Sequence, residues 1–303
     1  MELLYLLEKL RLPGLNEFML LITRLGEETA FLAIALVVFW CVDKRRGYFL
    51  MAVGFAGTII NQFLKLCFRV PRPWVLDEGF TILEQAREAA TGYSFPSGHT
   101  QMAVGTFGAL AVTEGRKPLR WLFWTLGFLV AFSRMYIGVH TPWDVAASVV
   151  IALVLVGGLR KPVMQGGRRE MKALIAGVLA MALGLLCYVE FWKFPADVDG
   201  HNLASGMKNA YTMLGCLAGV AMVYLLEQKY VNFDTKAVWW AQVLKVILGI
   251  GAVLLVKEGL RTPLEALLGE YPGRAVRYFL IVLTAGLLWP MTFRWFSGLG
   301  GKK

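Results

Sequence analysis

Long apolar stretches separated by short polar loops run through most of the chain. The first residues differ, because leucines over residues 2–11 alternate at roughly helical spacing with Glu8, Lys9 and Arg11, which predicts an amphipathic helix in a membrane interface. From residue 29 on, nine stretches approach the ~20 residues that a helix needs to cross a bilayer. Lipid cannot satisfy backbone hydrogen bonds, so we expect all of these stretches to be helical. The predicted spans cover residues 29–42, 48–68, 98–113, 119–139, 142–159, 172–193, 206–226, 238–256 and 276–296.

Two features of this pattern leave alternatives open. The apolar run from Phe18 to Leu25 is too short to span before Glu27 and Glu28, so one interpretation places it outside the first span. The alternative is a single long tilted helix from Asn16 to Trp40 that buries both acids. The spans at 98–113 and 142–159 are short, and we expect their ends to rely on burial in protein.

Composition places the chain among integral membrane proteins. Of its 303 residues, 57% are hydrophobic and only 17% are charged, with a mean hydropathy of +0.57. Soluble domains have nearer a quarter of their residues charged. The four cysteines are scattered without metal-ligand spacing, so we expect free thiols, no metal and no cofactor. The predicted fold class is an all-α polytopic transmembrane helix bundle.

The net charge of +10 is explained by the loops. Loops 43–47, 114–120 and 160–172 hold eleven Lys and Arg residues against Asp43, Glu114 and Glu170. The positive-inside rule places these loops in the cytoplasm. The charge is therefore a topology signal, and we expect no nucleic-acid partner.

Three short polar patches lie where predicted spans begin or end. Lys65 and Arg72 follow the second span, and His99 begins the third. Arg134 ends the fourth span, and Asp144 begins the fifth. Alternating spans place all of these ends on one side of the membrane, opposite the basic loops, so the patches can converge there.

The residue types in the patches suit a phosphate group. Lys65, Arg72 and Arg134 supply positive charge, and arginine can contact phosphate oxygens in bidentate fashion. Ser97 is placed as the N-cap of the third span, and Gly98 leaves room for an anion at the helix start. Each cation by itself could equally be snorkelling to the headgroups.

Two histidines and a carboxylate complete the set. Thr141 and Pro142 open the fifth span as cap and first residue, which would hold Asp144 near His140. A carboxylate that fixes an imidazole tautomer makes the other ring nitrogen a competent nucleophile, and His99 could act as general acid. Asp144 could instead be only a cap, and His99 only an interfacial histidine. Complementary roles at one membrane face favour a phosphate-handling site.

The three patches together resemble the type-2 phosphatidic acid phosphatase superfamily. Its signature is K-x6-RP, then PSGH, then SR-x5-H-x3-D. Lys65 to Pro73 match the first part, Pro96 to His99 the second, and Ser133 to Asp144 the third. All three parts are intact and in order, and the resemblance extends over roughly residues 28–193.

This resemblance implies a metal-independent phosphatase acting on a membrane lipid phosphate. It implies that His140 attacks phosphorus to form a phosphohistidine, that Asp144 orients it, and that His99 protonates the leaving group. The residues that it implies for binding the phosphoryl group are Lys65, Arg72, Ser97, Gly98 and Arg134. Candidate lipids are a polyprenyl diphosphate such as undecaprenyl diphosphate, phosphatidic acid, phosphatidylglycerol phosphate and a sphingoid phosphate. The implied location is the bacterial cytoplasmic membrane, with the site on the extracytoplasmic face.

Three segments follow from this organisation. We predict an interfacial region at 1–27, a six-span phosphatase core at 28–193, and three accessory spans within 200–303. Loop 74–95 is expected to cover the site as a polar lid or short helix, with Arg69 at the rim and His201 in a solvated loop. Lys245 lies in the middle of a span, so we expect an internal partner for it.

Two other functions remain open at this level. A phosphotransferase would use the same phosphohistidine with a lipid or sugar acceptor in place of water. A non-catalytic lipid transporter or scaffold draws weak support from the number of spans and from Lys245. The complete signature argues against the scaffold, which needs no pair of histidines.

Overall fold

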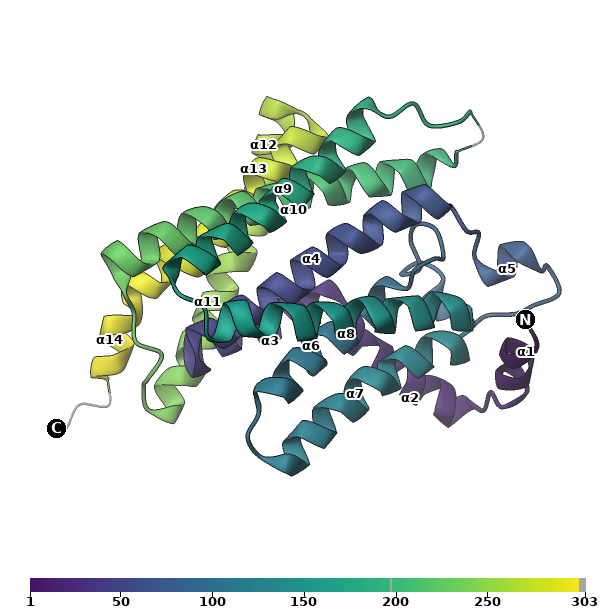
Figure 1. The fold of residues 1–303 in the computed structure, drawn as a ribbon, viewed down its shortest axis with the longest axis horizontal. Helices are drawn as coiled ribbons and strands as arrows, with labels where there is room; N and C mark the ends of the chain where they lie inside the picture. The colour runs from purple at the N-terminus through teal and green to yellow at the C-terminus, as the bar shows by residue number, and fades with distance from the viewer. Residues whose placement is uncertain (197, 300–303) are drawn as a thin grey trace. The chain divides into compact units, whose positions relative to one another are not determined.

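Helices form nearly all of the regular structure of the protein. The computed structural model describes residues 1–196 and 198–299, and within these ranges it contains helices but no strand (Figure 1). The predicted all-α fold class is confirmed. The α-helices are α1 (Glu2–Lys9), α2 (Pro13–Thr23), α3 (Glu28–Val37), α4 (Lys44–Phe68), α5 (Pro73–Leu76), α6 (Gly98–Thr113), α7 (Lys117–Tyr136), α8 (Pro142–Met164), α9 (Arg168–Phe191), α10 (Gly200–Leu226), α11 (Trp239–Gly259), α12 (Arg261–Leu268), α13 (Glu270–Leu283) and α14 (Phe293–Gly298).

Six helical segments in the described ranges are long and apolar enough to cross a membrane. The chain is accordingly an integral membrane protein. The last three segments contain α10, α11 and α13, as predicted for the accessory spans. The six segments are Lys44–Leu76, Pro142–Met164, Arg168–Phe191, Gly200–Val231, Trp239–Leu268 and Glu270–Gly298.

A bend of 57° separates α2 from α3, and only the two helices together qualify as a seventh span. The alternative prediction of one continuous helix from Asn16 to Trp40 is therefore wrong. A 3-10 turn at Arg24–Gly26 ends in extended backbone at Glu27, with φ −76° and ψ 152°. A Cβ added at Gly26 would lie 2.8 Å from the backbone oxygen of His99, so this glycine permits close approach to the start of α6.

The helices α6 and α7 lie side by side (Figure 1). Neither is among the six segments that are long and apolar enough to cross a membrane. α6 has only 16 residues, eleven of them buried, which confirms that the span at 98–113 relies on burial in protein. Gly127 of α7 lets the two backbones approach, because an added Cβ would lie 3.3 Å from the Cα of Val104.

α8 is longer than the predicted span at 142–159. It continues through Arg160 and Lys161 to Met164, so the short C-terminal boundary is wrong. Arg and Lys are good helix formers, and each added residue closes another backbone hydrogen bond. The helix therefore extends past the end of its apolar window.

The chain forms two compact units, each built from separated segments. Unit 1 comprises Met1–Leu32, Phe49–Lys161 and Lys193–Gly206. Unit 2 comprises Ala33–Tyr48, Pro162–Trp192 and the chain from Met207 on. The division into segments at residues 27, 193 and 200 stays a prediction. Every predicted site residue belongs to unit 1.

The core of unit 1 joins its helices around the site. Buried Val104, Ala131 and Val145 pack α6, α7 and α8 together. The predicted helix near the N-terminus is present as α1, and its Leu4 packs on Phe80 and Ile82 of the loop before α6. Whether α1 also lies in the membrane interface stays a prediction.

Unit 2 contains the predicted internal partner of Lys245. The Lys245 ammonium donates to the carbonyl oxygens of Trp40 at 2.9 Å and Thr235 at 3.2 Å. It also lies 4.4 Å from the ring centroid of Phe293. Carbonyl dipoles and an aromatic face are thus the contacts of this buried cation within the described ranges.

Candidate active site

The predicted site residues come from six places in unit 1. Lys65 is in the last turn of α4, Arg72 caps α5, and Arg134 is in the last turn of α7. His140 lies in the connection to α8, and Asp144 is in the first turn of α8. All five are buried, and Ser97, Gly98 and His99 at the start of α6 are buried or half-buried. The structure brings the three sequence patches together, while the roles of the residues stay predictions.

The Asp144 carboxylate faces the His140 imidazole. Oδ2 of Asp144 lies 3.5 Å from Nδ1 of His140 and accepts hydrogen bonds from the Thr141 amide at 2.7 Å and the Ser94 hydroxyl at 2.6 Å. In return, the Asp144 amide donates to Oγ1 of Thr141 at 3.3 Å. The predicted opening of α8 at Thr141 and Pro142 is present, and it holds Asp144 beside His140.

The hydrogen bonds around His140 select one tautomer. Nη1 of Arg72 lies 3.0 Å from Nε2 of His140. Because a guanidinium can only donate, Nε2 must be the acceptor and Nδ1 carries the proton that faces Asp144. Burial, and then the charges of Arg72, Arg134 and Lys65, lowers the pKa of His140 well below its usual range. The imidazole is therefore neutral, with the lone pair of Nε2 directed at the cations.

Three buried cations lie within electrostatic range of His140, and Arg72 is the one that contacts Nε2. Arg72 donates to the carbonyl oxygens of Val139 at 3.0 Å, Gly92 at 3.1 Å and Thr91 at 2.7 Å. The backbone thus fixes the orientation of its guanidinium.

Lys65 and Arg134 are held in a similar way. Lys65 donates to the carbonyl oxygen of Tyr93, and Arg134 donates to the Thr23 hydroxyl at 2.7 Å. Nε of Arg134 is buried and has no partner among the described residues. Across residues 1–196 and 198–299, neither side chain, nor that of Arg72, has a carboxylate within ion-pair distance. Buried charges are normally paired, so this cluster favours an anionic ligand.

The start of α6 presents its first turn to the cations. Ser97 is the predicted N-cap, and its hydroxyl oxygen accepts from the Thr100 amide at 3.4 Å. The Ser97 amide donates to the backbone oxygen of Asp144 at 3.2 Å, which ties α6 to α8. The nearest atom to a Cβ added at Gly98 would be Oδ1 of Asn61 at 3.6 Å, so protein packing leaves space there. His99 lies within electrostatic range of all three cations.

Sequence reasoning missed Ser94 and the carbonyl groups of loop 74–95. This loop was predicted as a lid or short helix, and it contains the end of the short helix α5 and a 3-10 turn at Glu84–Ala86. Its main contribution is backbone, because Thr91, Gly92 and Tyr93 accept from the two cations Arg72 and Lys65. Ser94 could have been found only from its position two residues before Pro96, in front of the second signature part.

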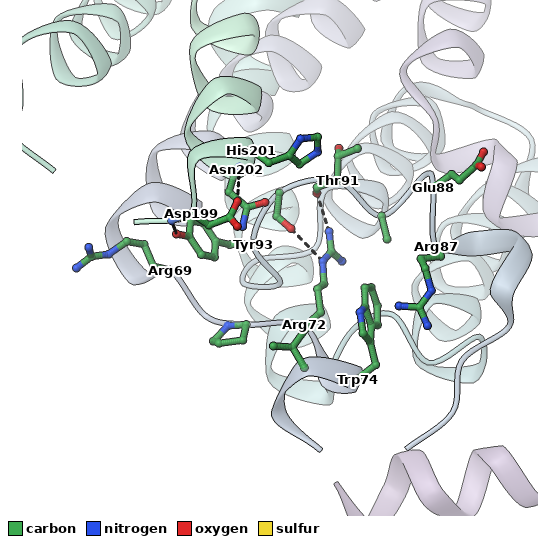
Figure 2. A pocket seen from close by; sticks show the side chains of 14 residues that line it. Arg69, Arg72, Trp74, Arg87, Glu88, Thr91, Tyr93, Asp199, His201 and Asn202 are labelled. Carbon is green, nitrogen blue, oxygen red and sulfur yellow. Dashed lines mark hydrogen bonds between the residues drawn. The ribbon is translucent and has the colours of Figure 1, made fainter. Parts of the chain in front are cut away.

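A pocket of about 570 Å³ adjoins the site at Arg72 (Figure 2). Its wall includes Arg69, which precedes α5, and Arg87, which lies in loop 74–95. Asp199, His201 and Asn202 also line it. The prediction that His201 lies in a solvated loop is wrong, because α10 begins at Gly200 and His201 belongs to its first turn. It is exposed, and it also lines this pocket.

The donor set does not point to a metal ion. Within the described residues, no group of three or more His, Cys, Asp or Glu side chains could hold one. Metal independence of the chemistry stays a prediction.

Comparison with known proteins matches two family descriptions to separate parts of the chain. Residues 45–164 match the PAP2 superfamily, and residues 211–302 match the transmembrane extension of PAP2 superfamily phosphatases. The first match contains all three signature parts. No solved structure matches the chain significantly.

Curated relatives match mainly the core. An undecaprenyl-diphosphatase of Bacillus subtilis is 33% identical over 42% of this chain and 63% of its own length. An undecaprenyl-diphosphatase of Sulfolobus acidocaldarius is 29% identical over 48% of this chain and 69% of its own. A phosphatidylglycerophosphatase B of Bacillus subtilis is 26% identical over 48% of this chain and 74% of its own. With its core and its C-terminal part both matched, the chain belongs to the PAP2 superfamily.

Proposed function

We propose that the protein is a phosphatase that hydrolyses a lipid phosphate or diphosphate in the membrane through a phosphohistidine intermediate. The observation that carries the proposal is the cluster of Lys65, Arg72 and Arg134, which are buried without a carboxylate partner among the described residues. Arg72 contacts Nε2 of His140, and the other two cations lie within electrostatic range of the imidazole. An anion that enters this cluster satisfies the cations and meets the nucleophile at the same place.

The proposed reaction has two steps. Nε2 of His140 attacks phosphorus, the N–P bond forms, and the bond to the leaving oxygen breaks with its electron pair on that oxygen. His99 gives this oxygen a proton. Water then attacks the phosphohistidine, His99 takes the proton of the water, and phosphate leaves with the N–P electron pair restored to His140. Asp144 stabilises the charge on the imidazole through Nδ1.

In the proposed reaction, Arg72 moves its hydrogen bond from Nε2 to a phosphoryl oxygen when substrate binds. Together with Lys65, Arg134 and the amides at Ser97 and Gly98, it would neutralise the negative charge on the phosphoryl oxygens in the transition state. These cations would supply the electrostatic stabilisation that a metal ion provides in other phosphatases, which is why we propose metal-independent chemistry.

The names of the relatives favour a polyprenyl diphosphate, and phosphatidylglycerol phosphate is the next candidate. The basic loops at 43–47, 114–120 and 160–172 support an extracytoplasmic site, because the site lies at the opposite helix ends. We propose the bacterial cytoplasmic membrane as the location.

The direct test is His140→Ala in detergent-solubilised protein, with undecaprenyl diphosphate, phosphatidic acid, phosphatidylglycerol phosphate and a sphingoid phosphate as substrates. We expect wild type to release phosphate from at least one lipid and the variant to lose at least about a thousandfold in kcat. The control is Val154→Ala, an exposed position on α8, and the elution volume of each variant checks folding. Unchanged turnover in His140→Ala would refute the mechanism.

Product analysis decides between hydrolysis and phosphotransfer. With a ³²P-labelled lipid, hydrolysis yields free phosphate and no labelled acceptor, and wild type but not His140→Ala yields an acid-labile phosphoprotein. A labelled lipid or sugar acceptor would replace the hydrolase proposal by the transferase.

A further inference from the structure

The pocket beside Arg72 has no part in the reaction as proposed above. Arg72 forms one of its walls, so a ligand that contacts the guanidinium can continue into the pocket (Figure 2). The polar part of the lining includes Arg87 and His201, and the apolar part includes Pro71 and Val75. The pocket therefore has the mixed character expected for the junction between a charged headgroup and a lipid chain.

Two guanidinium groups share one aromatic side chain in this wall. The Cζ atom of Arg72 lies 5.9 Å, and that of Arg87 5.1 Å, from the Trp74 ring centroid. In Figure 2 the indole stands between the two arginines. Cation–π contacts position both charges but do not neutralise them. Arg87 is also paired with Glu84, an exposed contact that is screened by solvent.

The connection between α9 and α10 closes another side of the pocket. The Asp199 amide donates to the Tyr93 hydroxyl at 3.2 Å, while the Tyr93 carbonyl accepts from Lys65. Asp199 in turn accepts from the Asn202 amide at 2.7 Å, which fixes the first turn of α10. This arrangement holds His201 at the pocket, and its side chain has no hydrogen-bond or ion-pair partner among the described residues.

The side chains around the pocket are not equivalent. Figure 2 shows His201 and Arg87 on different sides of Arg72, whereas the guanidinium of Arg69 points away from it. Glu88 is an acid in the same lining. Asp199 is a second acid, so the lining carries three arginines against two carboxylates. The two guanidinium groups beside Trp74 give that part of the wall a local positive charge, which favours an anion that reaches Arg72.

We propose that this pocket binds the leaving-group phosphate of a lipid diphosphate, with Arg72 shared between the two phosphates and with Arg87 and His201 facing the second. The inference rests on the proposed function and narrows its substrate to a diphosphate. The bond that breaks joins the terminal phosphorus to the bridging oxygen. The electron pair and the proton from His99 go to that oxygen, which leaves as part of a lipid monophosphate.

The test compares farnesyl diphosphate with farnesyl monophosphate, which carry the same chain. The ratio of their kcat/KM values measures the contribution of the second phosphate. We expect wild type to favour the diphosphate, and Arg87→Gln and His201→Ala each to lower the ratio about tenfold, as for loss of one hydrogen bond to a charged group. Glu88→Gln should raise the ratio, because it removes a negative charge from the same lining.

The matched control is Lys193→Gln, an exposed cation on the same connection but outside the pocket. It should leave the ratio unchanged. An unchanged ratio in both Arg87→Gln and His201→Ala would overturn the inference, as would a fall of the same size in Lys193→Gln.

Binding to the full-length protein separates this inference from the proposed function. Calorimetry with inorganic pyrophosphate and with orthophosphate should give tighter binding of pyrophosphate by about tenfold, reduced in Arg87→Gln and His201→Ala. If this preference is found while no lipid is hydrolysed, the pocket is supported and the phosphatase proposal fails. Equal binding of the two anions would overturn the inference that the pocket binds a second phosphate, whatever the result of the lipid assay.

Discussion

At the scale of single residues, the central contact is the shared Oδ2 of Asp144. This atom accepts a hydrogen bond from the Ser94 hydroxyl, and the Ser94 oxygen also lies 3.5 Å from Nδ1 of His140. A serine hydroxyl can donate to the carboxylate and accept from the imidazole at once. Ser94 thereby links the two groups and fixes the plane of the ring whose Nε2 faces the cations.

We predict that Ser94→Ala lowers kcat about tenfold with little change in KM, because the imidazole loses a hydrogen bond that orients it. Ser94→Thr keeps the hydroxyl and should recover most of the loss. Steady-state kinetics with the lipid that wild type hydrolyses best measures both constants.

Ser148→Ala is the control for this prediction. Ser148 is equally buried and donates at 2.8 Å to the backbone oxygen of Asp144 rather than to its carboxylate. Equal losses in Ser94→Ala and Ser148→Ala would mean that packing, not the orientation of the imidazole, sets the rate.

At the scale of elements, α1 and Arg11, two residues beyond its end, hold the loop between α5 and α6 in place. The Tyr5 hydroxyl donates to Asp77 at 2.8 Å, and Arg11 donates to the carbonyl oxygens of Thr81 at 2.9 Å and Tyr136 at 3.1 Å. The same loop supplies the carbonyl groups that orient Lys65 and Arg72. Its backbone must therefore be held in place for the proposed phosphate site to keep its shape.

We predict that Arg11→Ala increases amide hydrogen exchange over residues 77–93 and raises KM severalfold, because local opening becomes less costly when the loop loses its long-range contacts. Lys9→Ala is the control, since Lys9 is exposed and has no partner among the described residues. Hydrogen-exchange mass spectrometry in detergent measures the change. Wild-type exchange rates in Arg11→Ala would contradict the proposal that Arg11 holds this loop in place.

At the scale of the whole molecule, unit 2 combines the start of α4 with the C-terminal extension. Lys44 and Glu227 form an ion pair at 2.7 Å, in which the Glu227 side chain is only 1% exposed. Lys44 also lies 4.1 Å from the ring centroid of Phe233. The match to the PAP2 superfamily begins at residue 45, directly after Lys44, so this pair joins the start of α4 to a residue far along the chain.

We predict that Glu227→Gln lowers Tm by at least about 4 °C, because it leaves Lys44 half-buried without its counter-ion. Glu258→Gln is the control, since its pair with Lys257 is exposed and contributes little. Thermal unfolding of both variants in the same detergent measures the difference. Equal Tm values would show that the Lys44–Glu227 pair does not stabilise the unit.

The sequence by itself determined the helical class, most span positions and the residue types of the site. These properties are local, since apolar periodicity needs only neighbouring residues and a helix satisfies its own backbone. Thr141, Pro142 and Asp144 are close in the chain, so their capping contacts could be predicted as well. The boundary of α8 was missed because the polarity of Arg160 and Lys161 says little about where a helix ends.

Only the tertiary structure decided which irregular segments meet at the site. Ser94 and Asp144 are 50 positions apart, and the contact of Asp199 with Tyr93 joins residues 106 positions apart. The bend at Gly26 likewise depends on the approach of α6. Such contacts form where backbone groups outside helices find distant partners, and no periodic pattern encodes them. The sequence thus predicted the cluster of Lys65, Arg72 and Arg134, whereas the pocket that continues from Arg72 to His201 exists only in the folded chain.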